Sequence, residues 1–396
     1  MAVAPGIDQA AKKPSKLNDP RYRAWVFQIL ASLTVAGFIY WLVNNTLHNM
    51  ELRGISTGFA FLNNQAGFGV LQSLIEYDET HTYGRTFVVG LLNTLLVSGL
   101  GIFFATIIGF TIGVARLSHN WLVNRLAMTY IEIFRNIPLL LQIFFWYFAV
   151  AINLPGPREA MKISDLAFLS NRGLFIPRPV FEEGFGVTAL TILFAVVFVF
   201  FLVRWARCRR ELTGQSFHTV YVSLGILLGL PAIAFIATGK PLSWNIPEMG
   251  GFSFSGGLAV IPELFALTLA LSVYTGAFIA ETVRSGIQAV AHGQTEAARA
   301  LGLKHSWTLR LIVIPQAMRV IIPPLTSQYL NLAKNSSLAA AIGYPDLVAV
   351  FAGTTLNQTG QAVEVISITM AVYLTMSLVI SIFMNWYNAK MALTER

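Results

Sequence analysis

Charged residues are scarce in this chain. They make up 12% of its 396 residues, while 55% of the residues are hydrophobic. A soluble globular domain has about 25% charged residues, so the composition excludes an ordinary soluble domain. Together with a mean hydropathy of +0.63, it predicts an integral membrane protein with several spans. The net charge of +8 must therefore be tested as a sign of sidedness before it is taken as a sign of nucleic-acid binding.

Several chemical signatures are also missing. The single Cys208 excludes a disulfide within the chain and has no partner for a metal site. No GxxxxGK[ST] phosphate-binding loop is present, so the chain cannot supply its own ATP-derived energy. The histidines lie in loops or at the ends of apolar runs without paired ligand spacing, so we predict no metal, no cofactor and no catalytic site. They are His48, His81, His119, His218, His292 and His305.

Long apolar runs, in contrast, are abundant. A membrane-spanning helix needs about 20 mostly apolar residues. About 23 polar residues precede the first run and no small-residue cleavage site follows it, so we expect an uncleaved membrane anchor. The clear candidate spans are residues 24–44, 88–115, 126–152, 186–203, 218–238, 262–283 and 361–388.

Lysine and arginine are distributed unevenly between these runs. If residues 1–23 are cytoplasmic, the cytoplasmic segments 1–23, 116–125, 204–217, 284–319 and 389–396 contain 18 Lys and Arg, against 7 in the outer segments. Cytoplasmic loops of membrane proteins carry this excess. The positive charge is therefore a topology signal, and we predict a cytoplasmic N-terminus and no nucleic-acid partner.

The same bias predicts one span that hydropathy alone would miss. Residues 284–319 and the C-terminal tail are both basic, so an even number of crossings must separate them. Besides the last apolar run, the second crossing must be residues 320–345, despite Pro323, Pro324 and Lys334. A lysine near the middle of a membrane costs about 2.5–3.5 kcal/mol on insertion scales, so we expect this span inside a bundle or beside a cavity. The predicted fold is all-α, with about eight transmembrane helices and both termini in the cytoplasm.

A charged segment, EAARALGLKHSWTLRLIVIPQ (296–316), follows the span 262–283. It resembles the EAA loop of permease subunits of ATP-binding-cassette importers, with Ile314 as a conservative replacement for the family's leucine. An Ala- and Glu-rich helix is stable outside lipid, glycine can make the turn, and proline suits the first turn of the next helix. The resemblance implies a helix–turn–helix that docks on a partner ATPase; the alternative is a merely solvated loop. The matching residues are Glu296, Ala297, Ala298, Gly302, Ile312 and Pro315.

Four further segments resemble the polar amino-acid uptake branch of that permease family: GLLNTLLVS (90–98), YIEIFRNIPLLLQIFFWY (130–147), YTGAFIAETVRSGI (274–287) and NLAKNSSLAAAIGYPDL (331–347). They cover a core of five spans. The N-terminal span and the inserted helix pair 186–238 are additions that resemble the larger permease subunit of general L-amino-acid uptake systems. The expected organisation is a cytoplasmic tail (1–23), an extra helix with a periplasmic segment (24–85), the transmembrane domain (86–388) with its coupling loop (284–319), and a second cytoplasmic tail (389–396).

The resemblance also implies a function. We expect a permease that imports L-amino acids, polar or acidic over a broad range, across the bacterial inner membrane by alternating access. The implied partners are a nucleotide-binding ATPase dimer, a second, shorter permease, a periplasmic amino-acid-binding protein and membrane lipid. The outer segments 45–85 and 153–185 are candidates for docking the binding protein.

Polar residues within the spans are candidates for the substrate path, because such residues are costly in a membrane. A helix broken near Pro323 and Pro324 would expose backbone groups to a zwitterionic amino acid. The structural alternative is hydrogen bonding between packed helices. The candidates are Asn93, Thr94, Gln142, Asn331, Lys334, Asn335, Ser336 and Ser337.

Three charged residues lie near the cytoplasmic ends of spans. Arg135 could help close an inner gate, or could anchor its helix by reaching to the interface. Glu281 and Arg284 are one helical turn apart, a spacing that predicts a local ion pair in preference to a substrate contact.

Two other classes of function remain open alternatives. An ion-driven secondary transporter would have repeated halves with matching broken helices, but the sequence predicts one broken span and no clear repeat. A membrane-embedded enzyme would cluster catalytic side chains within its spans, and none is evident.

Overall fold

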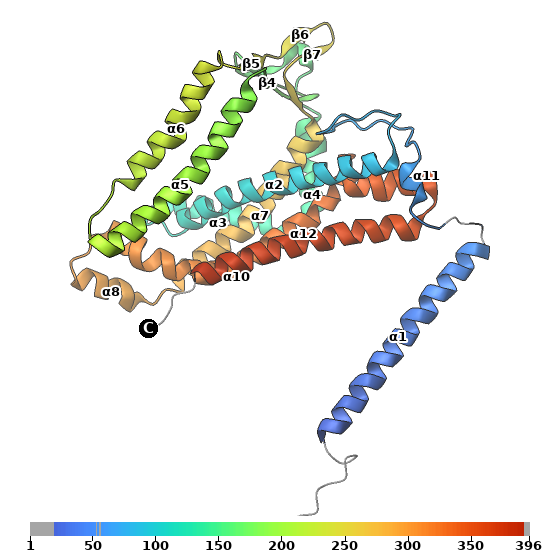
Figure 1. Cartoon of the computed structure of the whole chain (residues 1–396), viewed down its shortest axis with the longest axis horizontal. Coiled ribbons are helices and arrows are strands. Elements are labelled where there is room, and N and C mark those ends of the chain that lie inside the picture. The colour runs from blue at the N-terminus through green and yellow to red at the C-terminus, as the bar shows by residue number, and fades with distance from the viewer. Residues whose placement is uncertain (1–19, 53, 55–56, 392–396) are drawn as a thin grey trace, which may run out of the picture.

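The computed structural model describes residues 20–52, 54 and 57–391. The predicted cytoplasmic tails lie mostly outside these residues. The described part is mainly helical, and Figure 1 shows a bundle of long helices with an inserted helix pair and a separate N-terminal helix. The four long bundle helices are α2 (Tyr83–Ala115), α7 (Pro262–Gln288), α10 (Ile314–Asn335) and α12 (Ala362–Met391).

Small residues allow α2 and α7 to pack closely along their length. A Cβ atom added at Gly109 would lie 2.4 Å from the Ile279 side chain, and one at Gly113 would lie 2.7 Å from the carbonyl oxygen of Ala280. Such close approach is how transmembrane helices gain packing energy, since lipid tails remove any hydrophobic drive between them. Helix α7 is therefore the most buried candidate span, with 67% of its apolar window inside the protein.

Seven described helices are long and apolar enough to cross a membrane, or eight if one bent pair counts as a single span. This agrees with the predicted number. The hidden span is among them, because residues His305–Ile342 qualify with a hydropathy of 1.3, the lowest of the seven. This helix, predicted from the charges on either side of it, is thus one that hydropathy supports only weakly.

The predicted break near Pro323 and Pro324 is wrong. Helix α10 continues through both prolines to Asn335. Both rings lie on the exposed side of the helix, and transmembrane helices tolerate proline where local adjustments satisfy the freed carbonyls. The regular helix instead ends in the 3-10 segment η6 (Ser336–Ile342), which stops at Gly343 with φ +75°.

The predicted span 126–152 is not one straight helix. The amphipathic helix α3 (Trp121–Asn136) and the segment Leu139–Ala151 meet at an angle of 106°. Pro138 lies in the break with an extended ψ of 136°. Proline removes a helical hydrogen bond and disfavours the α conformation in the residue before it, and Ile137 is accordingly extended. The second arm comprises α4 (Leu139–Phe144) and the π-helical turn η3 (Phe145–Ala151).

Three apolar helices lie outside the bundle. In Figure 1, α1 (Pro20–Leu52) stands apart from all the others, and none of its apolar window is buried. Helices α5 (Phe185–Thr213) and α6 (Thr219–Ala237) form the inserted pair and pack mainly against each other. Their apolar windows are 11% and 0% buried, so their side chains are available to lipid.

The outer segments flanking the inserted pair contain short strands, which the all-α prediction omitted. Strand β3 pairs antiparallel with β8, and β4 with β5, so the two flanks of the insertion are joined to each other. The insertion therefore leaves the bundle after Ala151 and returns to it at Pro262 through one connected unit. The strands are β1 (Met161–Ser164), β2 (Ala167–Ser170), β3 (Gly173–Ile176), β4 (Arg178–Phe181), β5 (Leu242–Asn245), β6 (Glu248–Gly250), β7 (Ser253–Ser255) and β8 (Leu258–Val260).

The remaining elements are short. They connect the spans or extend them. They are η2 (Ala60–Asn63), η4 (Pro157–Glu159), α8 (His292–Ala300), α9 (His305–Thr308), η5 (Leu309–Val313), η7 (Val348–Thr355) and α11 (Leu356–Thr359).

Candidate coupling loop and translocation path

The EAA segment forms a helix that ends in a glycine turn. The N–H of Gly302 donates to the carbonyl of Arg299 at 2.9 Å, and the N–H of Leu303 donates to that of Ala298 at 3.1 Å. This pair of bonds is a Schellman motif, which satisfies the last carbonyls of a helix when the residue beyond it is left-handed. Gly302 has φ +73°, a conformation that glycine adopts without the steric cost of a Cβ atom. The glycine of the EAA pattern therefore sets the angle between α8 and the chain that follows.

One side of this hairpin is buried where α8 and α9 pack against each other and against η5, and the other carries exposed side chains. Ala298 is 1% exposed and Thr308 is also 1% exposed. Leu301, in contrast, is 80% exposed and Trp307 is 52% exposed. These two large apolar side chains are exposed on an otherwise polar hairpin, so they are candidates for contact with a partner.

The first residues of the EAA pattern lie on the exposed side. Glu296 and Ala297 are exposed, and the Glu296 carboxylate lies 3.0 Å from Nδ1 of His292, one turn earlier. This contact joins two exposed side chains of one helix, so it contributes little to stability. The carboxylate remains available to a partner.

The hairpin leads into α10 without a break in the helix. After α9, the turn η5 has π-helical geometry, and the N–H of Ile314 donates to the carbonyl of Leu309. Pro315 is the second residue of α10 and directly follows this π-helical turn, so the helical path lacks one backbone hydrogen bond there. Ile312 and Pro315 are both half-buried. A rigid connection of this kind can transmit a displacement of α8 to the transmembrane part of α10.

Asn93 and Thr94 fasten α2 to the segment after η6. The Nδ2 group of Asn93 donates to the carbonyls of Pro345 at 2.9 Å and Gln72 at 2.8 Å. The Thr94 hydroxyl accepts the N–H of Leu347 at 2.9 Å. Both side chains are 0% exposed. Both side chains are therefore bonded to backbone groups of the chain itself, and their place in the substrate path stays a prediction.

The sequence analysis did not single out Asp346, Tyr344 or Tyr373, which complete this buried network. The Tyr373 hydroxyl donates to Oδ2 of Asp346 at 3.4 Å, and Oδ1 accepts the N–H of Ala349 at 2.8 Å. Tyr344 donates to the carbonyl of Asn93 at 3.3 Å. An acid within the apolar run GYPDLVAV was the available signal, because a buried carboxyl requires hydrogen-bond partners.

The five polar candidates of α10 and η6 divide into two groups. Ser336 is buried and donates to the carbonyl of Ala333 at 2.8 Å, while Ser337 donates to that of Lys334 at 2.7 Å. Lys334 and Asn331 are exposed on the surface of the single chain, and Asn335 is half-buried. Lys334 forms no ion pair among the described residues. Lys334, Asn331 and Asn335 are thus the side chains that remain available to a substrate or a partner subunit.

Gln142 bridges the bend between α3 and α4. Its Nε2 group donates to the carbonyls of Phe134 and Ile137, each at 2.9 Å. These are carbonyls at the end of α3 that no longer have helical partners. Gln142 is 4% exposed, and these two bonds stabilise the break; its place in the substrate path stays a prediction.

The three charged residues near the predicted cytoplasmic ends of spans have local partners. Arg284 contacts both carboxylate oxygens of Glu281, at 2.9 and 2.5 Å. The geometry is the local ion pair that their spacing predicts. The Arg135 guanidinium lies 5.2 Å from the centre of the Phe278 ring on α7, within the range of a cation–π contact. Arg135 therefore ties α3 to α7.

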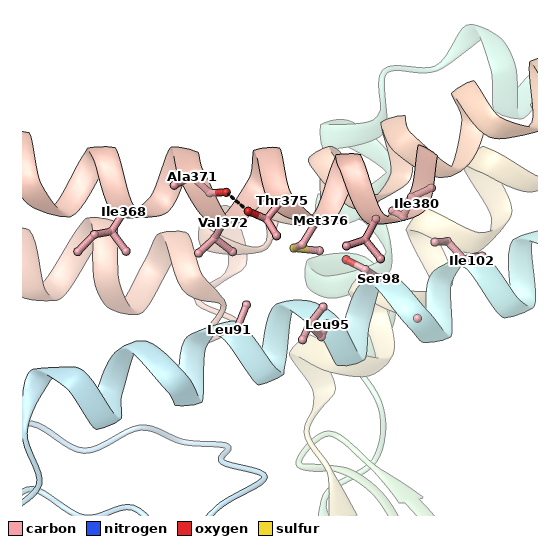
Figure 2. Close-up of a pocket in the computed structure, with 12 residues that line it drawn as sticks. Leu91, Leu95, Ser98, Ile102, Ile368, Ala371, Val372, Thr375, Met376 and Ile380 are labelled. Atoms are coloured by element: carbon pink, nitrogen blue, oxygen red, sulfur yellow. Dashed lines mark hydrogen bonds between the residues drawn. The ribbon is translucent and has the colours of Figure 1, made fainter. Parts of the chain in front are cut away.

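A groove between α2 and α12 has a volume of about 600 Å³. Figure 2 shows its lining, which is apolar apart from Ser98 and Thr375, and the Thr375 hydroxyl donates to the carbonyl of its own helix at Ala371. A zwitterionic amino acid would find no charged partner there. The described residues also contain no group of three or more His, Cys, Asp or Glu placed to hold a metal ion.

Comparison with known proteins identifies the family. Residues 226–393 match the family model "Binding-protein-dependent transport system inner membrane component". The chain is 59% identical, over 96% of both chains, to the putative amino-acid ABC transporter permease protein YhdX of Escherichia coli K12. It is 52% identical to the general L-amino acid transport system permease protein AapQ of Rhizobium johnstonii, covering 96% of this chain and 95% of the relative.

A third relative extends over the full length. The glutamate/glutamine/aspartate/asparagine transport system permease protein BztB of Rhodobacter capsulatus is 42% identical over 100% of both chains. The form of the hairpin and the full-length similarity thus both indicate a permease subunit. The chain belongs to the family of binding-protein-dependent transport system inner membrane components and is a permease subunit of an ATP-binding-cassette amino-acid importer.

Proposed function

We propose that this permease imports a broad range of polar and acidic L-amino acids. We also propose that the hairpin α8–α9 contacts the partner ATPase and is displaced by its conformational change. An importer permease of this family works in the inner membrane with an ATPase and a binding protein and is not itself an enzyme. The observation that carries the coupling role is the Schellman turn at Gly302 beside the exposed Leu301 and Trp307. If the ATPase holds these side chains in a groove, its movement would displace α8 and α10 together.

A second, shorter permease is the partner that we propose for the Lys334 surface. Lys334 is exposed on a helix that crosses the membrane. Facing lipid, an uncompensated lysine would cost about 2.5–3.5 kcal/mol on insertion scales. A second subunit placed over this face would enclose a polar path in which Lys334, Asn331 and Asn335 meet the substrate.

The substrate range is proposed from the relatives. The names of two of them specify general L-amino acids and the set glutamate, glutamine, aspartate and asparagine. A lysine in the path suits the carboxylate that every amino acid carries. This chemistry supports polar and acidic substrates without selecting one of them.

The orientation that we propose places both termini and α8 in the cytoplasm. The excess of Lys and Arg in the corresponding segments supports it. Cys208, the only cysteine, is exposed near the end of α5, so a membrane-impermeant maleimide reports its side directly. We expect labelling in inside-out vesicles and none in right-side-out vesicles; the reverse result would overturn the orientation.

Transport itself is tested in vesicles that contain the chain with its ATPase, second permease and binding protein. Radiolabelled glutamate, glutamine, aspartate and histidine are supplied separately, with ATP or with an ion gradient. We expect uptake that requires both ATP and the binding protein. ATP-dependent uptake restricted to one of the four amino acids would contradict the broad range, and ATP-dependent uptake without the second permease would contradict that partner.

A further inference from the structure

We propose that the cytoplasmic end of the inserted helix pair α5–α6 is a binding site for anionic phospholipid headgroups. The inference uses the proposed orientation but is independent of which amino acid is carried. It starts from the length of α5, which has 29 residues. Its first 19 residues, Phe185–Val203, contain no charged side chain, and at 1.5 Å per residue they span about 28 Å. A hydrocarbon core is about 30 Å thick, so Arg204 begins the part of α5 that lies at headgroup level.

That last part of α5 carries a dense positive charge. Arg204, Arg207, Arg209 and Arg210 lie within seven residues, and Glu211 is the only acidic residue of the segment 204–217. None of the four guanidinium groups forms an ion pair with a carboxylate in the described part of the chain. Arginine binds phosphate oxygens through paired N–H donors. A phosphate group would therefore provide the anion that this cluster does not have among the described residues.

Aromatic side chains fix the position of this cluster at the membrane surface. The Arg209 guanidinium lies 5.4 Å from the centre of the Trp205 ring, and Trp205 meets Phe217 edge-on with ring centres 5.5 Å apart. Arg209 also donates to Oε1 of Gln215 at 3.1 Å. Tryptophan prefers the level of the lipid headgroups. Arg209 is thus held within the protein, and three exposed arginines, Arg204, Arg207 and Arg210, are available to a ligand.

The surroundings identify a lipid as the ligand. Helices α5 and α6 stand outside the bundle in Figure 1, and only 11% and 0% of the residues in their apolar windows are buried. The molecules beside Arg204 are therefore lipids. Basic pockets between transmembrane helices on the cytoplasmic side bind anionic headgroups, and each basic residue near the surface adds about fivefold to the attraction.

Cys208 provides the probe for a direct test, because it is exposed within the cluster and is the only cysteine. The full chain is labelled there with a fluorescent donor and placed in phosphatidylcholine vesicles that contain phosphatidylglycerol. Energy transfer is compared between acyl-labelled phosphatidylglycerol and acyl-labelled phosphatidylcholine. We expect the phosphatidylglycerol acceptor to be enriched, and R204Q/R207Q/R210Q to reduce that enrichment by an order of magnitude or more, at about fivefold for each arginine.

The matched control is R158Q/R172Q/R178Q, which removes three exposed arginines from the segment between η4 and β4. It should leave the enrichment unchanged. High salt should reduce the enrichment of phosphatidylglycerol around the unaltered protein, because salt screens the attraction between surface charges. This measurement needs no variant. Equal transfer to both lipids, or enrichment that survives the triple substitution and high salt, would overturn the site. The assay contains no ATPase and no amino acid, so failure of the transport proposal would leave its outcome unaffected.

Discussion

The N–H of Leu303 donates to the carbonyl of Ala298 across the glycine turn at the end of α8. This bond fixes the direction in which the chain leaves the coupling helix. Because α9, η5 and α10 follow as one helical path, the turn also fixes how α8 is aimed relative to the membrane. The account of coupling rests on this local geometry.

The exposed apolar side chains of the hairpin should determine assembly with the ATPase. We predict that L301S/W307S weakens binding of the ATPase by tenfold or more, because buried aromatic anchors at interfaces contribute at least about 2 kcal/mol. Binding is measured by titrating the ATPase onto the reconstituted permease. L212S, at the comparably exposed Leu212 of the inserted pair, is the control and should have no effect. Normal binding by the double variant would exclude the patch as the docking surface.

Lys334 should affect transport without affecting folding. We predict that K334M reduces the uptake rate at least tenfold in vesicles that contain the assembled importer, since the substrate carboxylate loses a charged partner worth about 1.5–3 kcal/mol. Retained assembly is checked by gel filtration of the complex. K390M, which changes the lysine beside Trp386 at the end of α12, should transport normally. Equal rates for K334M and the unaltered importer would remove Lys334 from the path.

The Thr94 hydroxyl should contribute to stability through its bond with the N–H of Leu347. T94V leaves that buried N–H unpaired, which costs about 1–3 kcal/mol, and we predict a lower midpoint of thermal unfolding in detergent. T375V is the matched control, because the Thr375 hydroxyl bonds only to a carbonyl of its own helix. Equal midpoints for the two variants would show that the α2 junction does not depend on this bond.

Close packing of α2 against α7 gives a fourth prediction. G113A places a methyl group 2.7 Å from both the Ala280 carbonyl oxygen and Cβ of Val283, so the two helices must separate and thermal stability should fall. Overpacking of this kind typically costs about 1–3 kcal/mol. G99A, in the same helix, meets no atom within 4 Å and should be neutral or slightly stabilising. A stable G113A protein would contradict the described helix spacing.

The sequence predicted the family, the number of spans and the form of the coupling loop. The hidden span before Gly343 followed from the charges on either side of it, since sidedness constrains the number of crossings even where hydropathy is low. The ion pair between Glu281 and Arg284 followed from helical spacing alone. The alternatives of a secondary transporter and a membrane enzyme were wrong, as the family membership shows.

Other features depend on three-dimensional contacts. Helix α10 continues through Pro323, whose ring lies on the exposed side, whereas Pro138 coincides with a bend whose free carbonyls Gln142 satisfies. The hydrogen bond from Asn93 to the carbonyl of Pro345 joins residues 252 positions apart, so no local sequence pattern predicts it. The outer strands were missed because strands of three or four residues give too short a pattern to separate them from loops.

The most direct test of the coupling account compares G302P with G293A in vesicles that contain the complete importer, with ATP hydrolysis and amino-acid uptake measured together. Gly302 has φ +73°, which proline cannot adopt, whereas Gly293 lies in α8 with no atom within 4 Å of an added Cβ. We predict that G302P assembles and hydrolyses ATP but loses uptake, while G293A behaves normally. Uptake by G302P at the normal rate per ATP would contradict the role of this turn in coupling.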